Sequence, residues 1–295
     1  GHMHGFLNID KPAGMTSHDV VARVRRIARL RRVGHAGTLD PAATGVLVVA
    51  LGGATRLIEY VQDQTSKRYL ASVRLGVTTT TDDAEGEVLA EAPLPPLDTR
   101  AIEEVLARFR GWVEQVPPMY SALHHEGRRL HELARAGVTV ERKARRVLIE
   151  RLDLLAWEPP LLKIDVLCGK GTYIRSLARD IGAALGCGAH LAELRRTAVG
   201  QFRIEEAVPL AELERRSQQN EQLPLLPPER AVADWVRVDL DDREAQRVRN
   251  GQAIALRQAS GERARAHGPD GSLLALLERD GAVFKPVKVF DWSQG

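Results

Sequence analysis

The sequence contains little cysteine and no long apolar run. Only two of its 295 residues are cysteines, Cys168 and Cys187, and they form no C-x-x-C pair. A disulfide framework is therefore excluded, and we expect a reduced, cytoplasmic protein with free thiols. No apolar stretch reaches the ~18 residues that span a bilayer, and we expect neither a secretory signal nor a membrane anchor. The opening Gly1-His2-Met3 is typical of an expression remnant.

Several signatures of common cofactor and metal sites are also missing. The segment "CGKGTY" at 168–173 lacks the upstream glycine and the Ser or Thr of a phosphate-binding P-loop, and no H-E-x-x-H or G-x-G-x-x-G motif is present. His124, His125 and His131 lack companions at zinc-ligand spacing. The acidic residues at 78–87 lack calcium-loop spacing, so we expect a solvated loop there. A Ser-His-Asp triad stays open, although no G-x-S-x-G elbow occurs. We therefore expect no metal and no nucleotide cofactor.

Positive charge is concentrated in one part of the chain. The formal net charge is only +3. Residues 124–151 hold seven Arg and one Lys against four Glu, a net +4, so the remainder sums to −1. A local basic patch is typical of a site for a polyanion such as nucleic acid. A solvated charged hairpin would give the same composition.

The chain length predicts about two domains. Residues 215–231 mix polar residues with prolines and are the best candidate for a linker. We therefore expect one domain over 5–231 and a second, mostly β domain over 236–292, where glycine and Asp-Gly turns punctuate short strands. Hydrophobic spacing within the first domain predicts strands at 5–11, 46–51, 69–77 and 161–168. It also predicts helices at 17–32, 98–110 and 172–185, of which the first is capped by Ser17 and the third by Thr172.

Two charged residues occupy positions that local structure does not explain. Asp40 lies in "GHAGTLDPAATG", just before an apolar run. An Asp-Pro step commonly starts a helix, but the flanking glycines indicate the close approach of a backbone or a ligand. Arg175 falls in the first turn of its predicted helix, where the macrodipole disfavours a cation, and Tyr173 precedes it. An anionic partner for Arg175 and an accident of the surface both stay open.

Several separated segments resemble, in order, the TruB family of pseudouridine synthases. They are "LNIDKPAGMTSHDVV", "GHAGTLDPAATGVLVVALGGATRL", "KRYLASVRLGVTTTTDDAEGEV", "PPMYSALHHEGRRLHELARAGV", "CGKGTYIRSLARDIGAALG" and "HLAELRRTAVGQF". The tail, "GPDGSLLALLERDGAVFKPVKVF", resembles a PUA domain, an RNA-binding module. The resemblance implies an α+β fold, with a largely antiparallel mixed sheet flanked by helices, and a small β-rich PUA domain.

The same resemblance implies an activity and a partner. The family isomerises uridine to pseudouridine at position 55 in the T loop of tRNA, by base flipping and without a cofactor. The implied partner is the tRNA T stem-loop. We expect a cytoplasmic monomer that needs neither a membrane nor an obligatory protein partner.

The motifs assign catalytic roles by position. Asp40 aligns with the catalytic aspartate, Tyr69 with the tyrosine that stacks on the target base, and Arg175 with the arginine that pairs with the aspartate. Tyr173 aligns with a tyrosine near the flipped base, and His35 with a histidine that helps to hold the everted loop.

Further positions are expected to bind or support the substrate. Lys11, in a Lys-Pro motif, packs near the family's site. The basic segment at about 118–152 resembles an RNA-clasping insertion, and its candidate RNA contacts are Arg128, Arg129, Arg145 and Arg146. His124 and His131 stand where the family commonly has Lys and Tyr, which affects clasping and not the reaction.

Three other functions fit parts of the pattern. A non-catalytic tRNA-binding or tRNA-folding protein would need the basic segment and the tail, but not Asp40, Tyr69 and Arg175 together. A guide-RNA-dependent pseudouridine synthase is the second, although the basic insertion and compact tail favour the stand-alone type. An aspartate-dependent glycosidase would need a second carboxylate, and none is evident near the motif of Asp40.

Overall fold

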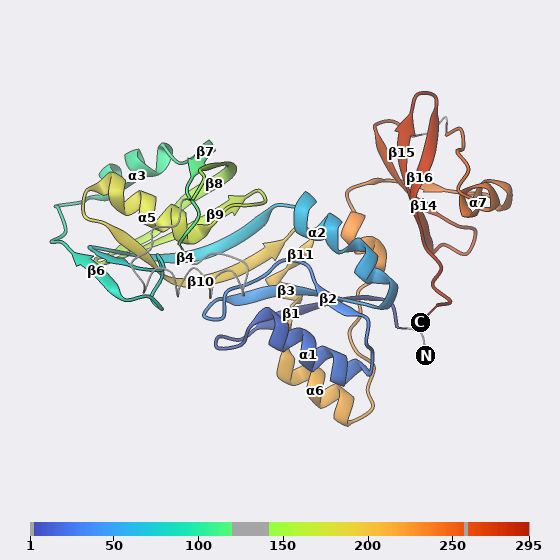
Figure 1. Ribbon diagram of the computed structural model, residues 1–295, viewed down its shortest axis with the longest axis horizontal. Coiled ribbons are helices and arrows are strands. Elements are labelled where there is room, and N and C mark those ends of the chain that lie inside the picture. Colours follow the sequence, from blue (N-terminus) through green and yellow to red (C-terminus); the bar gives the residue numbers. More distant parts are fainter. Residues whose placement is uncertain (1–2, 120–141, 257–258, 295) are drawn as a thin grey trace.

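A ten-stranded mixed sheet is the framework of the molecule (Figure 1). The computed structural model describes residues 3–119, 142–256 and 259–294. The strand order is β12-β1-β3-β10-β4-β9-β8-β7, with β2 paired to β3 and β11 paired to β10. The strands are β1 (Gly5–Lys11), β2 (Val33–His35), β3 (Thr44–Leu51), β4 (Lys67–Leu75), β7 (Gly111–Gln115), β8 (Arg145–Glu158), β9 (Leu161–Cys168), β10 (Ala189–Val199), β11 (Phe202–Arg203) and β12 (Val208–Pro209).

The pairing in this sheet is mainly antiparallel. Only β1 with β12 and β10 with β3 run parallel among its described pairs. The contact between β10 and β3 is short, with Arg195 opposite Thr44 and Arg196 opposite Gly45. This short contact joins the half of the sheet that contains β1, β2 and β3 to the half that contains β4, β9, β8 and β7. The largely antiparallel mixed sheet expected from the sequence is confirmed.

Helices cover each half of the sheet. α3 (Thr99–Ala107) and α5 (Ile174–Leu185) pack on β4, β8 and β9 around one apolar core. α1 (Ser17–Ala28) and α6 (Leu210–Gln218) pack on β1 and β3 around another. Along β3, Val46, Val48 and Ala50 face a third core on the other side, which includes α2 (Ile58–Gln64) and the short helix η1 (Gly52–Leu57).

The helix ends differ from those expected. Thr16, not Ser17, caps α1 through a reciprocal bond with Asp19, because the Ser17 side chain is buried and bonds to Leu39. α1 ends at Ala28, and Arg29 closes it in the left-handed conformation with φ 54°. Thr172 does not cap α5 either, because its hydroxyl donates to the Gly169 carbonyl.

The acidic segment at 78–87 is not simply solvated. It connects β5 (Val77–Thr79) to β6 (Val88–Glu91), which pair as a small separate sheet. Thr79 and Asp82 are only 5% and 8% exposed. The expectation of a solvated loop is therefore wrong for Asp82, which has a buried partner described below.

The last part of the chain forms a second sheet, here called the C-terminal unit (residues 236–292). Its strands are β13 (Val236–Asp239), β14 (Arg263–His267), β15 (Leu273–Asp280) and β16 (Val283–Val289), and α7 (Asp242–Arg249) packs against them. The segment expected as a linker is docked rather than free. Leu226 exchanges backbone hydrogen bonds with Phe6, and the short helix η3 (Pro228–Val232) leads into the C-terminal unit. A further short helix, η2 (Ile204–Glu206), lies earlier in the chain, between β11 and β12.

The C-terminal unit is attached by specific contacts. Trp235 and Phe290 belong to the third core, together with residues of β1, β3 and α2. Arg56 of η1 donates a hydrogen bond of 2.6 Å to the Val289 carbonyl, and Lys288 pairs with Glu59. These contacts fix the unit beside the end of the sheet where β3 finishes.

Candidate active site

The first two residues singled out by the sequence meet in space. The Arg175 guanidinium lies 3.3 Å from the Asp40 carboxylate, and the two come from different halves of the sheet. The Arg175 side chain is 8% exposed, whereas that of Asp40 is 44% exposed. Arg175 stands in the first turn of α5, where the helix dipole disfavours a cation, and the carboxylate offsets that cost. A half-exposed carboxylate beside a buried cation is available to a bound substrate.

A buried arginine holds the loop that carries Asp40. Arg196 is 2% exposed, and its guanidinium donates to the carbonyls of Val46 (2.9 Å), Gly37 (3.0 Å) and Thr38 (3.3 Å). Gly37 adopts φ 108°, a conformation that favours glycine. No helix follows Asp40, because β3 begins at Thr44, so the alternative of a helix cap is excluded.

Lys11 supports the same loop from behind. It is fully buried, and its ammonium group donates to the carbonyls of Pro12 and Met15 (both 2.8 Å) and Pro41 (3.0 Å). Burial lowers the pKa of Lys11 to about 8, and the nearby Asp40 charge opposes that change. Because all three donors are used, the contribution of Lys11 in this structure is to hold the turn beside Asp40.

Tyr69 lies on β4 directly opposite Arg196 of β10. Its half-buried ring packs against both the α3–α5 core and the α1–α6 core. Burial raises the pKa of the Tyr69 phenol, while the Arg196 charge opposes this change. The hydroxyl therefore keeps its proton at neutral pH. Tyr69 thus stands where the halves carrying Asp40 and Arg175 meet.

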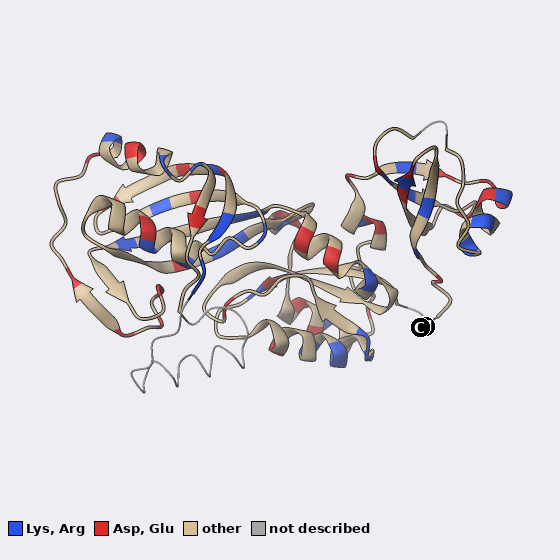
Figure 2. Ribbon diagram, turned by 45° about the horizontal axis from the view of Figure 1, so that its top comes forward, with Lys and Arg blue, Asp and Glu red and all other residues tan. Residues whose placement is uncertain are grey.

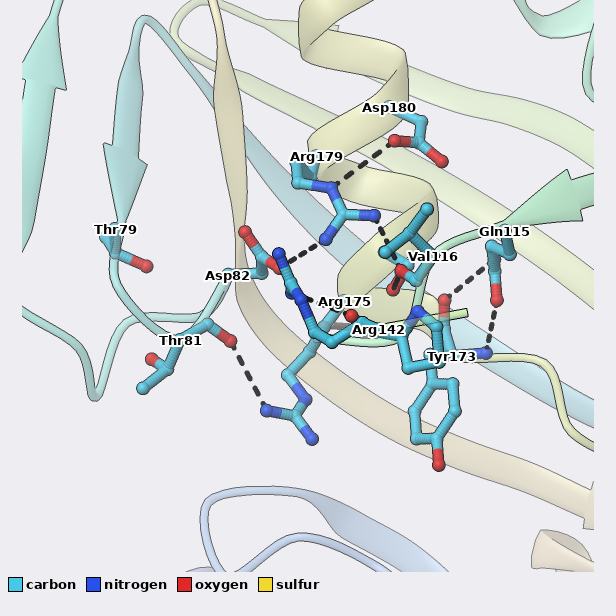
Figure 3. A network of polar contacts seen from close by, with 12 residues as sticks. Thr79, Thr81, Asp82, Gln115, Val116, Arg142, Tyr173, Arg175, Arg179 and Asp180 are labelled. Atoms are coloured by element: carbon cyan, nitrogen blue, oxygen red, sulfur yellow. Dashed lines mark hydrogen bonds and ion pairs between the residues drawn. The ribbon is translucent and has the colours of Figure 1, made fainter. Parts of the chain in front are cut away.

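The start of α5 is held by a pair of hydrogen bonds to its backbone (Figure 3). The Gln115 side chain accepts from the Tyr173 N–H at 2.9 Å and donates to the Tyr173 carbonyl at 3.0 Å. Arg175 also donates to the Thr81 carbonyl at 3.3 Å. Figure 3 shows the Tyr173 ring and the Arg175 guanidinium projecting to the same side of the helix start. No motif or spacing in the sequence had indicated a role for Gln115.

A second ion pair lies one helical turn further along α5 (Figure 3). Arg179 donates to the Asp82 carboxylate at 2.8 Å and to the Val116 carbonyl at 2.7 Å. Desolvation raises the pKa of Asp82, and the Arg179 charge counteracts this. Asp82 adopts φ 62°, and Ser176 also donates to Val116. The sequence analysis missed this pair, since Asp82 is one acid among several in its segment.

The remaining predicted contacts are distributed around this centre. His35, on β2, lies edge-on to His18 of α1 with ring centroids 5.8 Å apart. Arg145 and Arg146 begin β8, and Arg146 stacks 4.9 Å from the centre of the exposed Trp112 ring. Arg128 and Arg129 lie outside the described residues, as do His124 and His131.

The hollow of about 890 Å³ beside β4 contains none of the predicted site residues. It lies on the side of β4 that carries Arg68 and Leu70, whereas Tyr69 points to the other side. Arg68 pairs there with Asp165. Within the described ranges, no group of three His, Cys, Asp or Glu side chains could hold a metal ion. Nor is any described helix long and apolar enough to cross a membrane.

Comparisons with known proteins agree along the whole chain. Residues 25–174 match the TruB family pseudouridylate synthase N-terminal domain, 175–233 the tRNA pseudouridylate synthase B C-terminal domain, and 235–291 the tRNA pseudouridine synthase II C-terminal domain. The tRNA pseudouridine synthase B of Gloeobacter violaceus is 50% identical over 85% of this chain and 87% of that protein. The protein of the same description from Syntrophomonas wolfei is 46% identical over 98% of this chain and 99% of that protein.

Solved structures give the same assignment of the fold. A Cbf5-Nop10-Gar1 complex contains a chain with a TM-score of 0.72 and 28% identity, covering 97% of this chain and 85% of that one. An H/ACA RNP bound to a substrate RNA contains one with a TM-score of 0.74 and 27% identity, covering 98% and 86%. With full-length relatives above 40% identity and family models that match residues 25–233 and 235–291, the chain belongs to the TruB family of pseudouridylate synthases and is an isomerase that forms pseudouridine in tRNA.

Proposed function

We propose that this chain converts uridine 55 in the T loop of tRNA to pseudouridine, without a cofactor and with Asp40 as the essential residue. The observation that carries the proposal is the pairing of a half-exposed Asp40 with a buried Arg175 at 3.3 Å. The buried guanidinium forms an ion pair with the carboxylate and so holds it in position beside a bound nucleotide.

The reaction balances without an oxidant, a reductant or a second substrate. The C1′–N1 bond breaks, the uracil rotates, and a C1′–C5 bond forms. C5 then loses its hydrogen, and N1 gains a proton. Attack of Asp40 on C1′, its attack on C6 and removal of the 2′ proton are three routes to this outcome, and all three use an ionised carboxylate.

The target base must leave its stack to reach Asp40. Extrusion of a base costs a few kcal/mol, and stacking on an aromatic ring returns about 1–3 kcal/mol. We assign that stacking to Tyr69, which lies where the halves carrying Asp40 and Arg175 meet. We assign Tyr173 and His35 to the neighbouring nucleotides, and Arg145 and Arg146 to phosphates of the T arm.

We further propose that two parts of the chain have different functions. Residues 5–231 form the catalytic domain, and residues 236–292 act as a PUA-type RNA-binding domain. The enzyme acts in the cytoplasm as a monomer, without an obligatory protein partner or guide RNA. A guide-dependent synthase is the second candidate, because the similar solved structures come from Cbf5 complexes. The full-length relatives described as tRNA pseudouridine synthase B favour the stand-alone enzyme.

The deciding experiment measures tritium release from a tRNA transcript labelled at C5 of uridine, with no cofactor or partner added. We expect one label to be released per tRNA by the wild type, and none by Asp40→Asn, which should still bind tRNA. Asp63→Asn, an exposed acid on α2, is the matched control and should release the label normally. Turnover by Asp40→Asn would overturn the role of Asp40. Tight binding without release by the wild type would favour the guide-dependent or non-catalytic alternatives.

A further inference from the structure

A second concentration of positive charge lies on α1 and the turn that follows it. Residues 17–35 contain six arginines and one aspartate, a net +5, compared with +3 for the whole chain. Three of these arginines have structural partners. Arg23 pairs with Glu214, Arg25 donates to the carbonyls of Arg31 and Val33, and Arg32 donates to Thr55.

The other three arginines, Arg26, Arg29 and Arg31, have exposed side chains with no ion pair or hydrogen bond among the described residues. We call these three residues the α1 strip. Arg29 occupies the left-handed position that ends α1, with φ 54° and ψ 43°, where glycine would be free of strain. Repulsion among three neighbouring positive charges would be reduced by an anionic ligand.

The position of α1 connects the site to the C-terminal unit. At its start, the Ser17 hydroxyl bonds to the backbone of Leu39, the residue before Asp40. Beyond its end, the Gly52 N–H donates to the Arg32 carbonyl, and η1 reaches the C-terminal unit through Arg56. Figure 1 shows α1 running toward the side where that unit lies, and Figure 2 shows basic residues gathered at this end of the helix.

We infer that the α1 strip binds the phosphate backbone of the tRNA stem beyond the loop that enters the site. This inference rests on the proposed function for the identity of the RNA. Twelve helical residues span about 18 Å, or roughly six base pairs of an A-form RNA duplex at ~2.8 Å per pair. The strip therefore contacts the duplex about six pairs from the modified loop, just beyond the point where the T stem ends and the acceptor stem continues.

Charge chemistry favours an RNA duplex as the occupant. The strip contains guanidinium groups and no exposed large apolar side chain, so it offers phosphate contacts and little apolar area to a protein partner. Such contacts carry no sequence information. They add affinity that depends on salt and on the length of the stem.

The test compares tRNA binding by wild type and a triple variant, Arg26→Gln, Arg29→Gln and Arg31→Gln, across a range of salt concentrations. Loss of three phosphate contacts should lower the slope of log affinity against log salt by about 2–3, and should weaken binding roughly tenfold at low salt. A hairpin limited to the T loop and a five-pair stem should lose less than about twofold, since it ends before the strip.

Two controls separate charge from structure. Arg74→Gln, Arg100→Gln and Lys163→Gln together remove the same charge from two exposed positions on β4 and α3 and a partly exposed one on β9, and should leave binding unchanged. Replacing the three strip arginines with lysine should restore most of the affinity, because phosphate contacts need the charge. An unchanged salt slope in the glutamine variant, or an equal loss on the short hairpin, would overturn the inference.

The inference and the proposed function can fail separately. If the wild type binds tRNA through the strip but releases no tritium, the proposed function fails and the strip stands. If tritium is released normally and the strip variant binds like its charge-matched control, the strip fails and the proposed function stands. A wild type that binds no tRNA would overturn both.

Discussion

At the scale of single residues, the site depends on buried cations whose donors are directed at backbone carbonyls. Lys11 and Arg196 each serve three carbonyls around the Asp40 loop. A half-exposed carboxylate such as that of Asp40 makes few contacts with the rest of the protein, so buried groups have to hold the backbone that carries it. Arg175 differs from these two, because it contacts the carboxylate itself.

Lys11 predicts a pH dependence of stability. Its pKa is about 8 in the folded chain, against about 10.4 for a lysine in an unfolded chain. Above pH 8 the folded state therefore binds fewer protons here than the unfolded state, so this residue adds stability as the pH rises. The free energy of unfolding of wild type minus that of Lys11→Met should increase from about pH 8 to about pH 10.

Urea unfolding of both proteins at several pH values measures this difference. Subtracting the variant removes the contributions of cysteines and tyrosines that titrate in the same range. Lys163→Met, at a half-exposed position on β9, is the control and should give a difference that does not change with pH. A flat difference for Lys11→Met as well would contradict the prediction.

Residue types and spacing singled out Asp40 and Arg175, which pair in the structure, but not the residues that support them. Asp40 and Arg175 could be found because each is at odds with its local setting, one between glycines and the other at a helix start. Gln115 and Asp82 could not, because their partners lie 58 and 97 positions away in the sequence. Such long-range pairs leave no local pattern.

At the scale of elements, α5 is the best-supported helix of the site. Its first turns carry Arg175, Ser176 and Arg179, which bond to the β5–β6 connection and to the carbonyl of Val116. The helix therefore links the Asp40 partner to the strand end that leads into the basic segment. Alternation and helical spacing predicted the existence of this helix, but its start depends on Gln115 rather than on a cap in its own sequence.

The Asp82–Arg179 pair predicts a large cost for removing the cation. Arg179→Met would remove the cation that pairs directly with the mostly buried Asp82 carboxylate and leave only the weaker charge effects of Arg142 and Arg175, so it should lower the free energy of unfolding by about 3 kcal/mol. Chemical denaturation measures the change. Arg100→Met, whose side chain is 88% exposed in a surface pair on α3, should cost less than about 0.5 kcal/mol. If both variants lost the same free energy of unfolding, the buried pair would contribute no more to stability than the surface pair does.

At the scale of the whole molecule, one apolar core includes residues of both sheets. Trp235, 7% exposed, meets Tyr60 of α2 at 5.5 Å in an edge-on arrangement, and Arg263 of β14 stacks 4.3 Å from its ring. The sequence predicted the strand-rich tail but not this docking, because the docking contacts are scattered single residues. The connecting segment looked like a linker for the same reason.

Trp235→Ala should allow the C-terminal unit to unfold independently of the rest of the chain. Truncating a buried tryptophan costs about 3–5 kcal/mol, and here the loss falls between the C-terminal unit and the rest of the chain. We expect the wild type to unfold in one urea transition and the variant in two. Trp112→Ala, at a position 59% exposed, should keep a single transition. A single transition in both variants would show that the shared core does not couple the units.

The narrow parallel contact between β10 and β3 has a mechanical consequence. The halves that carry Asp40 and Arg175 are joined by two residue pairs between β10 and β3 and by the hydrogen bond from the Arg196 side chain to Val46. Beside this contact, the pairing of β10 with β4 is irregular between Arg196 and Ala198. A methyl group at Gly45 would meet the Arg196 carbonyl at 2.1 Å. Any side chain at this position would push β3 away from β10 and so change the distance between the halves that carry Asp40 and Arg175.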